Sequence, residues 1–129
     1  YFNKIIRNKK IDGCVMVFPE EWNSTKASYV KLDKQGFVTE SAEKQPISKT
    51  ATVGLHYFKK GSDLVKFGSE MIERGMEYND EFYVTPVYNV FSKYNKKIMT
   101  FPVKKMWALG SADEVNLFLN EFDYDSKIN

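Results

Sequence analysis

The sequence holds few of the residues on which common catalytic and metal sites depend. Its 129 residues include one cysteine and one histidine, Cys14 and His56. A single cysteine cannot form an internal disulfide, which agrees with a reducing compartment. His56 has no Cys, His or Asp neighbour at metal-ligand spacing, and no Ser-His-Asp or Cys-His order is present. We therefore expect no metal site, a buried apolar Cys14 and a structural His56.

Long apolar runs, clustered glycines and a strong charge of one sign are also missing. No stretch approaches the roughly 20 apolar residues that a membrane span needs. None of the seven glycines lies in a Gly-rich cluster of the kind that holds nucleotide phosphates. The net charge of +2 is too small for a strong nucleic-acid footprint. We expect neither a membrane nor a nucleic acid as partner.

The composition instead favours a globular α/β chain. Hydrophobic residues make up 43% and aromatic residues 16%, which argues against disorder. The length suits one domain over residues 1–129. Apolar periodicity and turn signals predict alternating helices and strands. The predicted strands cover 14–18, 29–32, 37–40, 52–58 and 97–103, and the predicted helices cover the stretch up to 10, 61–74, 81–94 and 111–122.

Two of these helices carry clear terminal signals. Gly61-Ser62-Asp63 offers an N-cap for a helix whose apolar stripe, made of Leu64, Phe67, Met71 and Ile72, stops before Gly75. Ser111 is the predicted N-cap of the last helix. The spacing of apolar residues in that helix predicts a buried face made of Val115, Phe118, Leu119 and Phe122.

A candidate ligand site lies at Glu43 and Lys44, shortly before a strand that contains Gly54. A carboxylate accepts hydrogen bonds from hydroxyl groups, and an ammonium group can meet a phosphate. The pair therefore suits a small polyol phosphate. A glycine inside a strand marks a close approach by a ligand or backbone, a β-bulge or tight packing. At Gly54 these explanations stay open.

Several sequence blocks follow one another in a recognisable order around this site. They are Ser28-Tyr29-Val30-Lys31-Leu32-Asp33, Gly36-Phe37-Val38-Thr39-Glu40, Glu81-Phe82-Tyr83-Val84, Pro86-Val87-Tyr88-Asn89 and Met106-Trp107-Ala108-Leu109-Gly110. The series resembles the C-terminal half of sugar nucleotidyltransferases, a family that includes the glucose-1-phosphate thymidylyltransferase type and capsular-polysaccharide enzymes. The resemblance implies the C-terminal part of a GT-A/Rossmann-like α/β sandwich with a mixed sheet.

The resemblance also implies a role for individual residues. Glu43 would contact the sugar hydroxyls and Lys44 the sugar phosphate, where the alternative is a surface turn with ordinary charges. Thr52 and Gly54 would approach the sugar from the next strand. Glu81 would be an acidic residue near the sugar, or else a carboxylate at a helix N-terminus. The substrate-binding set, with Tyr29 included, is Glu43, Lys44, Thr52, Gly54, Tyr29 and Glu81, and no catalytic residue is assigned.

Two departures from the family pattern concern the substrate and the metal. The family's Tyr-Gly-Val is Ser28-Tyr29-Val30 here, so a phenol replaces a glycine that lies against the hexose. The family's Asp-Thr-Gly, whose Asp binds metal, is Ala108-Leu109-Gly110 here, and alanine cannot ligate Mg²⁺. Asp113 is interpreted as an ordinary carboxylate in the first turn of a helix.

The family's Gly-rich phosphate loop and its metal-binding Asp strand have no counterpart in this sequence. We therefore expect the sugar-side part of a cytoplasmic enzyme that uses an NTP, a sugar phosphate and Mg²⁺ to make surface-polysaccharide precursors. Alone, this part is expected to be inactive, and an exposed sheet edge leaves self-association into a homo-oligomer open. The alternatives are a non-catalytic binding or interaction module of the same fold, or an enzyme acting on a non-sugar phosphate.

Overall fold

The computed structural model describes residues 3, 7–19 and 24–122, and its strands form one mixed sheet. The strand order is β3-β2-β4-β1-β5, with β1 parallel to β5 and the other neighbours antiparallel. This arrangement confirms the predicted α/β class with a mixed sheet. The strands are β1 (Gly13–Pro19), β2 (Ser28–Leu32), β3 (Val38–Glu43), β4 (Thr50–Phe58) and β5 (Ile98–Pro102).

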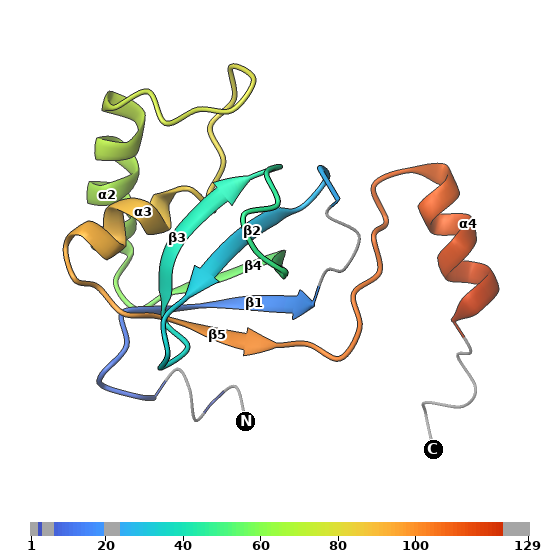
Figure 1. Ribbon diagram of the computed structural model, residues 1–129, viewed down its shortest axis with the longest axis horizontal. Helices are drawn as coiled ribbons and strands as arrows, with labels where there is room; N and C mark the ends of the chain where they lie inside the picture. Colours follow the sequence, from blue (N-terminus) through green and yellow to red (C-terminus); the bar gives the residue numbers. More distant parts are fainter. Residues whose placement is uncertain (1–2, 4–6, 20–23, 123–129) are drawn as a thin grey trace.

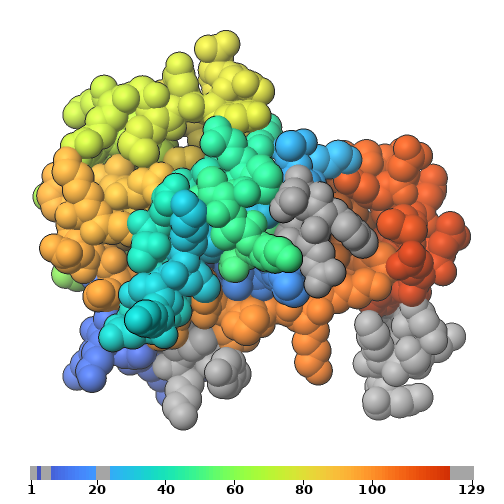
Figure 2. Space-filling view, viewed as in Figure 1, coloured from blue at the N-terminus to red at the C-terminus, as the bar shows by residue number. Residues whose placement is uncertain are grey.

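The helices lie on two sides of the molecule (Figure 1). Helices α2 (Gly61–Glu73) and α3 (Val87–Lys93) pack together and cover one face of the sheet. Helix α4 (Ala112–Glu121) stands at the opposite side, beyond the end of β5. The space-filling view shows the same separation, with the loop after α2 rising at one end of the molecule (Figure 2).

The core fills the space between the sheet and helices α2 and α3. Val15, Val30 and Ile98 point from the strands toward Phe67 of α2 and Phe91 of α3, and all five are at most 2% exposed. The rings of Phe67 and Phe91 meet edge to face with centroids 4.7 Å apart. Aromatic pairs in this geometry add to the stabilisation from buried area. The apolar side chains predicted for the strands and for the middle of α2 therefore build this core.

Asp33 and Gly36 shape the turn between β2 and β3. Gly36 has a φ of +85°, and the Asp33 carboxylate accepts from the backbone N–H groups of Gln35 and Phe37. A glycine takes this left-handed conformation without the strain of a Cβ atom. An isolated antiparallel bridge between Phe37 and Met99 joins the hairpin to β5.

Cys14 occupies the buried position expected of an apolar residue. It is 1% exposed on β1, and burial raises the pKa of its thiol to about 11. A thiol with so high a pKa stays protonated near neutral pH and is a weak nucleophile. The prediction of a structural cysteine is therefore confirmed.

Helices α2 and α3 differ from their predictions at the N-terminal ends. The N-cap of α2 is Lys60, without a side-chain cap, and Ile72 of the predicted apolar stripe is 53% exposed. The helix predicted over 81–94 begins only at Val87, after Pro86 at its N-cap. A proline has no N–H to donate and disfavours helical backbone in the residue before it, so the preceding residues form a loop.

Helix α4 begins as predicted but lacks the predicted buried face. Ser111 caps it by accepting from the backbone N–H of Glu114 at 3.4 Å. No residue of α4 is fully buried, and Val115 and Leu119 are 38% and 67% exposed. The amphipathic pattern therefore predicted the helix correctly, but the burial that it predicted for one face of the helix is wrong. The predicted first helix falls partly on residues outside those described. No described helix has the length and apolarity of a membrane span.

Candidate functional site

A row of polar side chains crosses three strands on the face that α2 and α3 cover. Ser28 of β2 pairs with Glu43 of β3, and the Ser28 hydroxyl donates to the Glu43 carboxylate at 2.5 Å. Tyr29 pairs with Ala51 of β4, and continuing that antiparallel register sets Ser28 opposite Thr52. Glu43 and Thr52 are 7% and 6% exposed. A carboxylate is rarely buried this deeply without hydrogen-bond partners, and Ser28 supplies one.

Lys44 is the first residue after β3 and has an unusual backbone conformation. Its φ is +51°, in the left-handed region that residues other than Gly, Asn and Asp seldom adopt. Such conformations persist where the surrounding structure holds them, and they gather at ligand sites. The sequence predicts Glu43 and Lys44 together in a turn. In the structure Glu43 ends the strand and Lys44 begins the turn, so their side chains have different surroundings.

The Lys44 ammonium group lies against two tyrosines from the loop between α2 and α3. It donates to the Tyr83 hydroxyl at 2.6 Å and lies 4.5 Å from the centroid of the Tyr83 ring. The Tyr78 ring centroid is 5.6 Å away. Aromatic faces attract cations at these distances. The ammonium group of Lys44 is thus held by two residues distant from it in the sequence.

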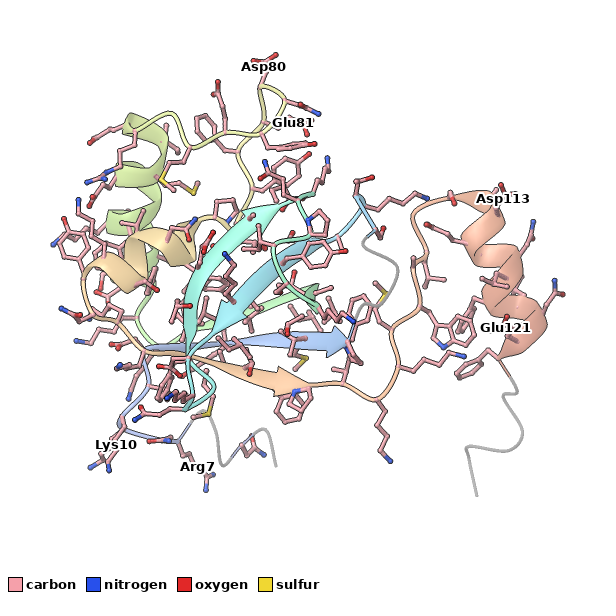
Figure 3. All side chains as sticks on the ribbon, viewed as in Figure 1. Arg7, Lys10, Asp80, Glu81, Asp113 and Glu121 are labelled. Atoms are coloured by element: carbon pink, nitrogen blue, oxygen red, sulfur yellow. The ribbon has the colours of Figure 1, made fainter. Side chains whose placement is uncertain are left out.

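A tight two-residue turn shapes this loop. The backbone N–H and C=O groups of Tyr78 and Glu81 pair with each other, and between them Asn79 and Asp80 both have positive φ, +51° and +61°. Two left-handed residues in succession are the signature of a type I′ turn. The turn carries Glu81 to the Tyr83 hydroxyl, which donates to the Glu81 carboxylate. Figure 3 shows Asp80 and Glu81 on this loop, above the end of β3.

The structure decides one of the two alternatives that the sequence offered for Glu81. The interpretation as a carboxylate at a helix N-terminus is wrong, because α3 begins at Val87. Glu81 is exposed, and the Tyr83 hydroxyl links it to the Lys44 ammonium group. The Tyr83 hydroxyl therefore lies between the Lys44 ammonium group and the Glu81 carboxylate.

The electrostatics of the site favour a permanently charged lysine. The hydrogen bond to Tyr83 is the largest influence that raises the pKa of Lys44, and the charges of Glu81 and Glu43 add to it. A group that is already protonated at neutral pH becomes harder to deprotonate under these influences. Lys44 can serve as a fixed positive charge for an anion, whereas it is poorly suited to act as a general base.

Gly54 lies in a bulge of β4, next to the polar row. Val15 of β1 pairs with His56 and Val17 pairs with Thr52, so one residue of β1 between these pairs faces three of β4. Gly54 has a φ of +77°, and no described atom beyond its chain neighbours lies within 4 Å of the place where a Cβ would stand. The bulge is therefore present, tight packing does not explain the glycine, and the adjacent space is open.

Tyr29 lies on the opposite face of the sheet from Glu43. Its neighbours Ser28 and Val30 point toward α2 and α3, and side chains alternate along a strand. The Tyr29 side chain is fully buried and donates its hydroxyl to the Ser24 carbonyl at 2.7 Å. The structure thus separates the Tyr29 phenol from the other predicted binding residues, apart from the backbone that it shares with Ser28.

His56 and Asp113 take the structural places expected of them. The His56 ring packs beside Phe58, and its Nδ1 lies 2.7 Å from the Tyr88 hydroxyl. Burial raises the pKa of Tyr88 and lowers that of His56, so the phenol donates to a neutral imidazole. Asp113 is an exposed residue in the first turn of α4, far across the molecule from Glu81 (Figure 3). The described residues gather no group of three or more His, Cys, Asp or Glu able to hold a metal.

Ser28, Tyr78 and Tyr83 are the site residues that the sequence did not single out. Ser28 could have been found from strand alternation, because a hairpin centred on Asp33–Gly36 sets it opposite Glu43. Tyr78 and Tyr83 lie on either side of the turn at Asn79 and Asp80, and the helix predicted over 81–94 would have included Tyr83. No local signal connects them with Lys44, since the contact depends on how the loop after α2 folds over β3.

Comparisons with known proteins agree with this fold. A solved structure of a nucleoside-diphosphate-sugar pyrophosphorylase from Vibrio cholerae RC9 superposes with a TM-score of 0.74 at 25% sequence identity. The match covers 86% of this chain and 47% of that chain, so this chain spans about half of that protein. No family model and no curated protein sequence matches the chain. The likeness supports a nucleotidyltransferase-like fold.

Proposed function

We propose that this chain is the acceptor-binding part of a nucleotidyltransferase that joins a nucleotidyl group to a sugar 1-phosphate. The observation that carries the proposal is that Lys44 follows the buried Glu43 directly at the end of β3 and has its ammonium group held by Tyr83. The Glu43 carboxylate can accept from hydroxyl groups, and its charge helps to raise the pKa of the Lys44 ammonium group, which can meet a phosphate. The likeness to a nucleoside-diphosphate-sugar pyrophosphorylase supports the same class of reaction.

The proposed reaction needs few groups of this chain, and these act by binding and positioning. A phosphate oxygen of the sugar 1-phosphate attacks the α-phosphorus of the NTP, and the bond to the leaving pyrophosphate breaks. Lys44 would offset the negative charge of the attacking phosphate, which lessens its repulsion from the triphosphate. Glu43 would accept from a sugar hydroxyl, which orients the phosphate for attack. None of these residues needs to gain or lose a proton.

The remaining predicted residues would shape the acceptor pocket. Thr52 continues the polar row beside Ser28, and the open space at Gly54 lies next to it. Glu81 would act close to the phosphate through Tyr83. Tyr29 would contribute only through its backbone, because its phenol lies on the other face of the sheet.

Magnesium would bind outside the described residues of this chain. When bound, Mg²⁺ supplies charge neutralisation for the triphosphate. It takes oxygen ligands, but the described part of the chain brings no group of three acidic or His side chains together, and Ala108 offers no side-chain oxygen. The metal therefore belongs to the complete enzyme, which we propose to be a cytoplasmic protein that supplies surface-polysaccharide precursors.

A non-catalytic binding module of the same fold is the second candidate. It is favoured by the lack of a metal-binding group among the described residues. Such a module would keep the Glu43 and Lys44 pocket for a sugar phosphate, or for another phosphate, and would release no pyrophosphate. The two candidates thus share a ligand and differ in turnover.

Pyrophosphate release from the complete protein, with NTPs and sugar 1-phosphates supplied in pairs, tests the proposal. We expect release with one pair, and we expect Lys44→Met to lower kcat/KM for the sugar phosphate about 10-fold to 100-fold, since charged hydrogen bonds contribute about 1.5–3 kcal/mol. Lys34→Met, at an exposed hairpin position, should leave kcat/KM unchanged. Binding without release for every pair would support the module instead. An unchanged kcat/KM in Lys44→Met would remove Lys44 from the site.

A further inference from the structure

Tyr83 connects the Lys44 ammonium group with the Glu81 carboxylate. Its hydroxyl accepts from the Lys44 ammonium group at 2.6 Å and donates to the Glu81 carboxylate. Its ring also lies under the ammonium group, 4.5 Å from centroid to nitrogen. Tyr83 is half-buried, so this contact is partly shielded from water. One side chain thus fixes both the position of the cation and its link to a carboxylate.

We propose that Tyr83 is a positioning residue, which holds the Lys44 ammonium group ready for the acceptor phosphate while Glu81 anchors the Tyr83 hydroxyl. The inference rests on the proposed function, because it takes the phosphate of the acceptor as the ligand of Lys44. It goes beyond that function because it assigns part of the phosphate affinity of Lys44 to Tyr83, a residue that need not touch the substrate.

The physical reason is the conformational freedom of lysine. A free lysine side chain samples many rotamers, and a ligand that fixes it must overcome the entropy lost. Here the Tyr83 hydroxyl and ring already confine the ammonium group before a ligand arrives. An ammonium group has three N–H donors, so the bond to Tyr83 leaves two for phosphate oxygens. The contact therefore prepares Lys44 for an anion without using up its donors.

Glu81 completes the arrangement from the other side of the hydroxyl. A tyrosine hydroxyl can rotate, and a carboxylate that accepts its proton turns the oxygen lone pairs toward the lysine. The tight turn at Asn79 and Asp80 fixes where that carboxylate stands. Removing the Tyr83 hydroxyl alone separates this effect from the aromatic contact, since phenylalanine keeps the ring.

The test compares Tyr83→Phe with Tyr78→Phe, a matched variant on the same loop whose ring meets Lys44 without a hydrogen bond from its hydroxyl to that residue. Inorganic phosphate is the probe, and NMR of the lysine side chains in the complete protein reports both binding and the pKa of Lys44. We expect Tyr83→Phe to weaken phosphate binding about threefold to tenfold, as the loss of one hydrogen bond predicts. We also expect it to lower the pKa of Lys44, and Tyr78→Phe to leave this pKa unchanged.

Each result decides for or against the inference. Equal phosphate affinity and an equal Lys44 pKa in Tyr83→Phe and wild type would overturn it, while the proposed function could still stand on Lys44 itself. Tighter phosphate binding in Tyr83→Phe would also overturn it, because Tyr83 would then compete with the phosphate. No phosphate signal at Lys44 in the wild type would overturn the positioning role and the proposed phosphate contact together. Equal thermal stability of the two variants shows that the change is not one of folding.

Discussion

Ser28 and Glu43 face each other across β2 and β3, and the Ser28 hydroxyl donates to the buried carboxylate at 2.5 Å. The sequence separates them by the whole β2–β3 hairpin, and only the strand register brings them together. Because Thr52 continues the same row on β4, the Glu43 carboxylate is part of a polar strip built into the sheet. A hydrogen bond in this position orients Glu43 before any hydroxyl-bearing ligand arrives.

The Ser28 hydroxyl should contribute measurably to stability. Ser28→Ala leaves a buried carboxylate oxygen without this donor, and such a loss costs about 1–3 kcal/mol. In Glu43→Gln, where the charge is gone, the further change Ser28→Ala should cost less. Urea denaturation of the wild type, both single variants and the double variant measures the coupling free energy. Simple additivity of the two changes would show that the bond makes no net contribution.

The sequence was sufficient for the elements that depend on neighbours in the chain. The β2–β3 hairpin follows from Asp33 and Gly36, and the Glu43–Lys44 pair is visible as a chemical signal without any fold. The row through Ser28 and Thr52 depends on the register of the strands. The position of the hairpin turn predicts the register between β2 and β3, but no turn predicts the register between β2 and β4. The link from Lys44 to Tyr83 could not be predicted, because it joins two loops whose meeting depends on the packing of α2 and α3.

Gly54 should be required for the bulge in β4. Its φ of +77° disfavours any residue with a Cβ, so Gly54→Ala should lower the free energy of unfolding by about 1–2 kcal/mol. Gly68 provides the matched control, since it lies inside α2 with open space beside it and no positive φ. Gly68→Ala should stabilise by about 0.4–1 kcal/mol. Chemical denaturation of both variants checks the opposite signs, and a neutral Gly54→Ala would mean that the bulge can relax.

The spacing of apolar residues predicted correctly that helices α3 and α4 exist. It did not predict the exposure of α4, which depends on a partner surface, or the start of α3, which depends on a proline. The apolar residues of α4 follow helical spacing, yet Leu119 is 67% exposed because no described element packs over it. Pro86 shortens α3, and the left-handed pair at Asn79 and Asp80 turns the preceding chain away from a helix. A pattern of apolar residues shows which face of a helix is apolar, but it does not show which other element, if any, packs against that face.

Stability should fall on mild acidification through His56. Burial lowers the pKa of this imidazole in the folded protein, so between that value and the ordinary one, about 6.5, the unfolded chain binds the proton and the folded chain does not. The stability contributed by His56 is therefore present above about pH 6.5 and is lost as pH falls toward the folded pKa. Each pH unit in this range lowers the free energy of unfolding by at most about 1.4 kcal/mol.

A variant isolates this effect from the titration of the carboxylates. In His56→Asn the amide oxygen can accept from the Tyr88 hydroxyl in place of Nδ1, but the side chain does not titrate. Denaturation of wild type and variant at pH 7.5 and pH 5.5 gives the difference. We expect the wild type to lose more stability than the variant, and parallel losses would assign the acid sensitivity to other groups.

The turn at Asn79 and Asp80 should control both stability and the surroundings of Lys44. Both residues are left-handed, and glycine at the second position of a type I′ turn carries less strain than aspartate. Asp80→Gly should therefore keep the stability within about 0.5 kcal/mol of the wild type and leave the pKa of Lys44 raised. Asp80→Val places a β-branched residue at a φ of +61° and should lower the free energy of unfolding by about 1–2 kcal/mol. Because this turn brings Glu81 to Tyr83, the valine variant should also bind inorganic phosphate more weakly, which NMR of Lys44 measures. If phosphate affinity stayed constant while stability fell, the turn would be structural and unconnected with the site.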